Sequence, residues 1–212
     1  MTTLTWPELV LRRTRLDERD LLVLVGPEPD YRWRALTADI VELAGRLGVA
    51  QWISLGAIPA AVPHTRPVPI IGTEASPGLL RGEVMAGPEG TLRVPSALVS
   101  ALEIEVSAAG IPALGYFAQV PHYVSGPYAT ARSSSRAAVA THLGAEIPAH
   151  ELADESRELR ERLDTAAGLD ETTRSYVERL EAMYDEQRLP SGDDLISDIE
   201  RFLRDQGGAT RG

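Results

Sequence analysis

The chain has 212 residues, a formal net charge of −10 and no cysteine. This length leaves room for one globular domain with an attached extra segment, while the negative charge argues against nucleic acid and anionic membranes as partners. The lack of cysteine excludes disulfides, thiolate catalysis and cysteine-ligated metal sites. No apolar run approaches the roughly 20 residues of a membrane-spanning helix, and the N-terminus lacks a signal-peptide pattern, so we expect a cytoplasmic protein.

The first third of the chain alternates between apolar runs and one amphipathic pattern. Residues 8–13 and 21–25, separated by a charged turn, predict a hairpin, and the second run is apolar throughout, as in a strand covered on both faces. Residues 31–48 repeat apolar positions at a helical period and end in glycine, which predicts a helix. Residues 49–59 and 67–72 predict two further strands. This order of strand, helix and strand is typical of a parallel sheet.

The middle of the chain continues the alternation. Residues 73–91 carry glycines and prolines without periodicity and are interpreted as a loop. Residues 95–110 predict a helix, and residues 111–120 predict another buried strand. Residues 133–144 predict a third helix, capped by serine and ended by glycine. We therefore expect an α/β fold with a mainly parallel sheet between helical layers.

The composition changes at Pro148. Residues 151–188 are dense in charge and have a helical period, with Gly168 as the break between two helices and Asp170 as the N-cap of the second. A solvated helical surface is the simplest explanation of this charge. The closing segment predicts one more helix, whose apolar face would comprise Leu195, Ile196, Ile199, Phe202 and Leu203.

These changes in composition predict three parts. Residues 1–148 form the α/β core, residues 149–206 form a helical appendage, and residues 207–212 form a flexible tail.

The tripeptide Val-Pro-His occurs twice, at residues 62–64 and 120–122, each time near the end of a predicted strand. In open parallel sheets ligands bind beyond the carboxyl ends of the strands. The loop after residues 21–25 follows its strand in the same way. If the strands are neighbours, one edge of the sheet would gather six candidate ligand-binding or interaction residues: Glu28, Trp33, His64, Arg66, His122 and Tyr123.

Two interpretations of these strand ends stay open. A histidine near neutral pKa could act as a general acid or base oriented by Glu28, and Arg66 could hold a phosphate or carboxylate. Alternatively, proline ends each strand, and the neighbouring histidine or arginine satisfies carbonyl groups left free there. The sequence has no nucleophile elbow, no nucleotide-binding glycine motif and no metal-ligand spacing, so we predict no cofactor and no metal.

Four segments, in their order and spacing, resemble the proteasome assembly chaperone family, in particular its bacterial members related to the second eukaryotic chaperone. They are GPEPDYRW, LGAIPAAVPHTRPVPIIG, GIPALGYFAQVPHYVSGPYATA and LPSGDDLISDIERFLR. The resemblance implies an α/β/α fold similar to nucleoside phosphorylases and related hydrolases, self-assembly into homo-oligomers and, in eukaryotes and archaea, help in assembling the proteasome core particle. The helical tail fits the actinobacterial branch of the family.

This chain departs from the family pattern at both ends. Family members usually have a further βα unit ahead of the hairpin, so the core of this chain lacks that unit; either its start is truncated or a sheet edge is covered by a partner chain. Chaperones that dock on the proteasome α-ring often end in a hydrophobic residue, tyrosine and one more residue, whereas this chain ends in GGATRG.

We therefore expect a non-enzymatic interaction or assembly-chaperone-like protein. Its expected partners are copies of itself and proteasome core subunits, and its expected contact residues in the tail are Tyr176, Leu180 and Phe202. The alternative is a binding protein or enzyme for a small phosphate or carboxylate compound, which would use His64, Arg66 and His122.

Overall fold

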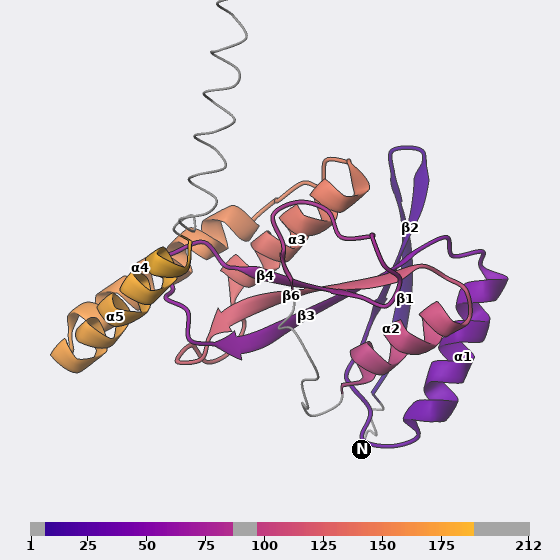
Figure 1. Ribbon diagram of the computed structural model, residues 1–212, viewed down its shortest axis with the longest axis horizontal. Helices are drawn as coiled ribbons and strands as arrows, with labels where there is room; N and C mark the ends of the chain where they lie inside the picture. The colour runs from indigo at the N-terminus through magenta and orange to yellow at the C-terminus, as the bar shows by residue number, and fades with distance from the viewer. Residues whose placement is uncertain (1–6, 87–96, 189–212) are drawn as a thin grey trace, which may run out of the picture.

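A four-stranded mixed sheet lies at the centre of the computed structural model, which describes residues 7–86 and 97–188 (Figure 1). The strand order is β3-β6-β4-β5. β3 and β6 are parallel, β4 runs antiparallel to β6, and β5 is parallel to β4. The strands are β3 (Trp52–Ala60), β4 (Ile70–Glu74), β5 (Met85–Ala86) and β6 (Ala113–Pro121).

Helices cover both faces of this sheet, which confirms the expected α/β sandwich. The alternating side chains of β6 separate the two layers. Leu114, Tyr116 and Ala118 pack with α3 (Ala129–Leu143) in the main core. A side chain at Gly115 would instead collide with Glu103 of α2 (Leu98–Ala108), so α2 approaches the opposite face closely.

Two apolar clusters form the core. The main cluster, between the sheet and α3, comprises Ile70, Leu114, Tyr116, Ala118, Tyr128, Ala131 and Val139. The second cluster joins α2 to α1 (Trp33–Arg46) and comprises Ile40, Leu98 and Leu102, with Leu24, Trp33, Leu36 and Trp52 packed against them. α1 therefore lies outside α2 as a further layer, as Figure 1 shows.

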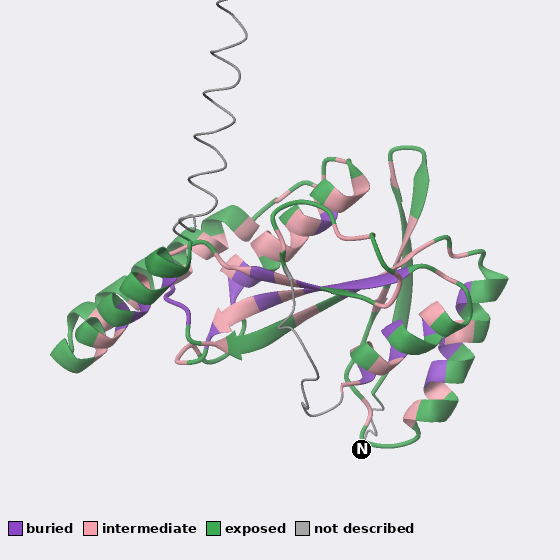
Figure 2. Ribbon diagram, in the orientation of Figure 1, coloured by how far each residue is buried: buried purple, intermediate pink, exposed green. Residues whose placement is uncertain are grey.

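The apolar run at residues 21–25 is not a strand of the central sheet, so that expectation was wrong. The predicted hairpin is present as β1 (Val10–Leu16) and β2 (Arg19–Val25), but among the described residues these two strands pair with each other and not with the central sheet (Figure 1). Most of the hairpin is exposed (Figure 2), and Val25 is 59% exposed. Only the uninterrupted apolar run supported the buried strand, and such a run does not reveal which neighbour its backbone pairs with.

Two smaller expectations were also wrong. The segment interpreted as loop, residues 73–91, contains the short strand β5 and the end of β4. α3 begins at Ala129 after Tyr128, so the serines at residues 133–135 lie inside the helix and do not cap it. Its other end agrees with the sequence, because Gly144 adopts the left-handed conformation (φ 59°) that glycine tolerates best at a helix terminus.

The predicted helices of residues 151–188 are present as α4 (Leu152–Gly168) and α5 (Glu171–Gln187). The Asp170 carboxylate accepts a hydrogen bond from the Thr173 amide at 2.7 Å, which confirms the predicted N-cap. α4 packs on α3, and its Leu159 and Leu163 contact the main core.

The predicted helix of the closing segment, with Phe202, and the tail at 207–212 lie outside the described residues. In the part of the chain that the structure describes, every helix is too short or too polar to cross a membrane.

Candidate functional site

The two Val-Pro-His segments lie side by side at one end of the central sheet. β3 and β6 are parallel neighbours, with Ala60 opposite Pro121, and the amide of His122 donates a hydrogen bond to the carbonyl of Ala60 at 3.1 Å. Both segments therefore leave the sheet at its carboxyl edge, as the sequence predicted for this pair of strands.

His64 is buried at this edge, with 2% of its surface exposed, and both of its ring nitrogens have partners. The Tyr123 hydroxyl lies 2.7 Å from Nδ1 and also accepts a hydrogen bond from the backbone amide of His64 at 2.8 Å. Because that oxygen accepts from the amide, we assign its own proton to the bond with Nδ1. Nε2 then carries the ring proton and donates to Oδ1 of Asp164 on α4, at 3.1 Å.

Tyr123 is well suited to this donor role. Burial raises the pKa of its phenol to about 12, so the hydroxyl keeps its proton at any physiological pH. The result is a fixed chain of hydrogen bonds from Tyr123, two residues after the end of β6, through the loop after β3, to α4. Within it the imidazole of His64 has no free nitrogen for a substrate.

His122 forms a second link, between the strand end and α5. Its Nδ1 lies 3.0 Å from the carbonyl oxygen of Ala60, which requires a proton on Nδ1, so Nε2 accepts from the Tyr176 hydroxyl at 3.1 Å. The rings of His122, Tyr123 and Tyr176 pack edge to face in all three pairs, with centroids 5.7 to 6.2 Å apart. Such pairs stabilise by about 0.5–1.5 kcal/mol beyond the area they bury.

Arg66 forms a third link, entirely with acidic side chains of α5. Its guanidinium donates from Nε and Nη2 to the two carboxylate oxygens of Asp185, at 2.9 and 2.7 Å, and from Nη1 to Glu181 at 3.2 Å. The hydrogen bonds from Arg66 lower the pKa of Asp185 and raise that of the guanidinium. Thr65 also donates to Glu181. The planar fork that could bind a phosphate is therefore occupied by carboxylates of the same chain.

These three links, which we call the strand-end latch, hold α4 and α5 against the sheet. The latch consists of His64, Arg66, His122 and Tyr123 at the strand ends, and Asp164, Tyr176, Glu181 and Asp185 on the helices. Beneath it α5 buries Val177, Leu180 and Tyr184, and the Tyr184 hydroxyl donates to the carbonyl of Pro67 at 3.0 Å.

A comparison with protein-family models matches residues 1–167 to the PAC2 family. The chain belongs to the PAC2 family. A solved PAC2 structure from Streptomyces avermitilis is 33% identical, with a TM-score of 0.70 over 82% of this chain and 74% of that one. A Mycobacterium tuberculosis protein of unknown function is 31% identical, with a TM-score of 0.77 over 85% and 63%.

A proteasome-assembly chaperone homologue from Mycobacterium tuberculosis is 28% identical, with a TM-score of 0.74 over 83% of this chain and 75% of that one. A search of curated proteins found no match. The resemblance drawn from the sequence motifs is therefore confirmed, and it includes actinobacterial members of the PAC2 family.

Two of the six candidate residues lie away from the latch of this PAC2 chain. Glu28 accepts a hydrogen bond from the amide of Leu98 at 3.2 Å, and so satisfies a free donor at the start of α2. Trp33 donates from its indole to the carbonyl of Pro29 at 2.5 Å and packs on the cluster between α1 and α2. The expected convergence fails for this pair because β2, which precedes both residues, is not a neighbour of β3 in the central sheet.

Two of the three tail residues expected to contact a partner pack within this chain. Tyr176 is half-buried and bonded to His122, and Leu180 is only 3% exposed because it packs inside its own chain. Neither is therefore an open surface for a partner. Phe202 lies outside the described residues.

The acidic half of the latch was not predicted from the sequence, because a solvated helical surface was the simplest explanation of the charge of the tail. One signal was available. Glu181 and Asp185 are four residues apart and share a helix face with the apolar Val177 and Leu180, where carboxylates need a partner. Across residues 7–86 and 97–188, no three histidine or acidic side chains are grouped closely enough to hold a metal ion.

Proposed function

We propose that this PAC2 protein is a non-enzymatic interaction protein with an assembly-chaperone-like role, whose partners are proteasome core subunits. Its family and its similarity to a proteasome-assembly chaperone homologue support a role of this kind. The observation that carries the proposal is the strand-end latch. The side chains best suited to chemistry are bonded to helices of the same chain, so they serve to present α4 and α5.

The surface thus presented is acidic with two exposed apolar positions. Between residues 151 and 188 acidic side chains outnumber basic ones two to one. Leu169, at the tip between α4 and α5, is 84% exposed, and Met183 of α5 is 50% exposed. Apolar anchors surrounded by charge are typical of protein-binding surfaces. We infer that this face of the helical pair contacts the partner.

Affinity capture tests this proposal. The tagged full chain would be expressed in its own host, and captured proteins would be identified by mass spectrometry. We expect recovery of proteasome core subunits by the wild type and a large loss with Leu169→Arg combined with Met183→Arg. Leu43→Arg combined with Leu47→Arg is the matched control, because these exposed leucines lie on and just after α1. A wild type that captures no core subunit would overturn the proposal.

The alternative of a small phosphate or carboxylate ligand at His64, Arg66 and His122 is weakened by the same geometry. A ligand there would have to displace Asp185 from the guanidinium of Arg66 and Asp164 from the imidazole of His64. A thermal-shift screen of phosphorylated and carboxylated compounds tests this. A ligand at a hundred times its Kd would add about 2.7 kcal/mol of stability, and this gain would be absent in Arg66→Ala.

A further inference from the structure

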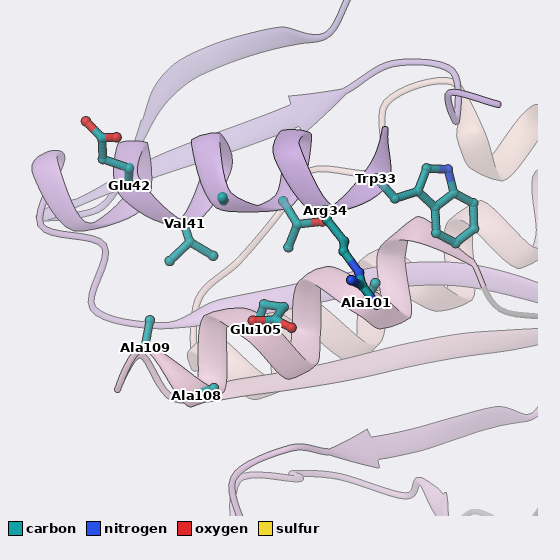
Figure 3. Close-up of a pocket in the computed structure, with 10 residues that line it drawn as sticks. Trp33, Arg34, Val41, Glu42, Ala101, Glu105, Ala108 and Ala109 are labelled. Carbon is teal, nitrogen blue, oxygen red and sulfur yellow. The ribbon is translucent and has the colours of Figure 1, made fainter. Parts of the chain in front are cut away.

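A groove of about 980 Å³ runs along α1 and α2 (Figure 3), and none of the residues that line it belongs to the strand-end latch. Small side chains line it, among them Ala38 on α1 and Ala101 and Ala108 on α2. Ile104, close to Ala101 and Ala108 on α2, is 63% exposed. This volume is at the upper end of the range for small-molecule pockets, and the groove is open along the two helices, so an elongated polypeptide segment fits it better than a compact ligand.

Side chains of opposite charge lie towards the two ends of the groove. Arg34 lies near the start of α1, beside Ala101, whereas Glu42 lies towards the other end of the groove (Figure 3). Glu105 adds a second carboxylate on α2. A suitable occupant is therefore apolar along one side, acidic where it meets Arg34, and basic towards Glu42.

We propose that residues 191–205 of a second copy of this chain dock in the groove as an amphipathic helix. The sequence of this segment has the required pattern, with Leu195, Ile196, Ile199, Phe202 and Leu203 on one helical face. Asp193 and Asp194 lie near its start and Arg201 and Arg204 near its end, while Asp198, Glu200 and Asp205 are further acidic residues of the segment. Asp194 and Arg204 are ten residues apart, about 15 Å along a helix, and Arg34 and Glu42 are eight apart, about 12 Å.

The distance between the end of α5 and the groove indicates that the docked segment comes from a second copy. The end of α5 is fixed beyond the carboxyl end of β3 by Tyr184 and Pro67, whereas the α1–α2 cluster contacts Trp52 at the other end of β3. A strand of this length spans about 26 Å. Residues 188–190 reach at most about 10 Å. The segment of the same chain therefore starts too far from its own groove.

Cysteine cross-linking tests this arrangement in the full chain, which has no cysteine of its own. Ala38→Cys in one tagged copy would be mixed, under mild oxidation, with Leu195→Cys, Ile199→Cys or Phe202→Cys in a differently tagged copy. We expect a disulfide between copies for at least one pair. Ser197→Cys, on the opposite helical face, and Ala153→Cys, exposed on α4, are the matched controls.

The outcomes separate the possible occupants. Cross-linking between copies at the apolar positions and not at the controls supports the proposal. Equal cross-linking at the controls, or none at any position, overturns it. A disulfide formed within one chain that carries both Ala38→Cys and Ile199→Cys, with no product between copies, would assign the segment to its own groove and also overturn it.

Light scattering gives a second measurement that does not depend on the choice of cysteine positions. We expect the wild type to be an oligomer and Ala38→Glu combined with Ala108→Glu to be a monomer, because both alanines are exposed in the groove and the substitutions block it without disturbing the core. Ala153→Glu should keep the mass of the wild type. A monomeric wild type, or an unchanged mass in the groove variant, would contradict the proposal. Neither result depends on whether proteasome subunits bind.

Discussion

The two Val-Pro-His segments have the same sequence and leave the same edge of the sheet, yet their histidines are in different environments. His64 is buried, and both ring nitrogens are bonded to side chains. His122 is exposed and bonds to a backbone carbonyl and to Tyr176. The reason is register. Val120 is still within β6, opposite Pro59, whereas Val62 comes three residues after Pro59, in the loop beyond β3.

A repeated motif therefore determines where the chain leaves a strand, whereas the elements packed above the motif determine the contacts of each residue in it. In the first segment α4 and α5 close over the loop, so His64 becomes a buried connector between β6 and α4. In the second segment the same residue type stays near solvent and adds one contact to α5. The substitutions below should separate the two roles.

The largest effect is expected for His64→Ala. It leaves a cavity in place of a buried ring and removes one hydrogen-bond partner each from the half-buried Tyr123 and from Asp164, so the free energy of unfolding should fall by about 3 kcal/mol. Urea denaturation followed by circular dichroism measures this loss. Tyr123→Phe, which removes only the hydroxyl, should give a smaller loss of the same sign. A loss below about 1 kcal/mol for His64→Ala would show that the buried histidine is not a structural connector.

A pH-dependent effect of intermediate size is expected for Arg66→Met. The hydrogen bond from Arg66 lowers the pKa of Asp185 below its ordinary value of 3.8, so this ion pair stabilises the folded chain above that pH and stops doing so as pH falls through the lowered pKa. The melting temperature of the wild type should exceed that of Arg66→Met at neutral pH, and the difference should shrink below about pH 4. Asp185→Asn should behave like Arg66→Met, and combining the two should add little. A difference that persists unchanged in acid would rule out this ion pair as its source.

The smallest effect is expected for His122→Ala. The hydrogen bonds of this exposed side chain can be replaced by water, so the main loss is that of its two edge-to-face ring contacts, and the free energy of unfolding should fall by about 1 kcal/mol. The same urea experiment, with Tyr176→Phe as the matched partner variant, measures it. If His122→Ala cost as much as His64→Ala, the contrast drawn between the two segments would be incorrect.

Much of the fold was predictable from the sequence because it depends on local patterns. Periodicity located α1, α2, α4 and α5, and Asp170 marked the start of α5. The two proline-ended strands were expected at one edge of the sheet, where β3 and β6 lie. The placement of β2 was not predictable in this way. An apolar run indicates that a strand is buried or paired, but it does not indicate which strand is its partner.

The candidate site was predictable only in part, for a different reason. The strand-end residues of the latch follow from the Val-Pro-His repeat, but Asp164 contacts His64 from 100 residues further along the chain, and Asp185 contacts Arg66 from 119 residues further on. The charge of a helical residue does not predict which residue of the sheet it contacts. Glu28 was assigned to the strand ends, whereas its carboxylate accepts a hydrogen bond from the first turn of α2, a helix that begins 70 residues later.

The position of β6 between β3 and β4 has a consequence for how the chain folds. β3 and β4 follow each other in sequence but do not pair, because β6, which is made later, lies between them and supplies the ladder partners of both. During synthesis the central sheet therefore cannot form until about residue 121 has been made. Until then β3 and β4 lack the backbone hydrogen-bond partners that β6 supplies. Contacts between such distant segments slow folding and leave apolar edges open to aggregation. A chain of this design therefore depends on timely completion of its own central strand.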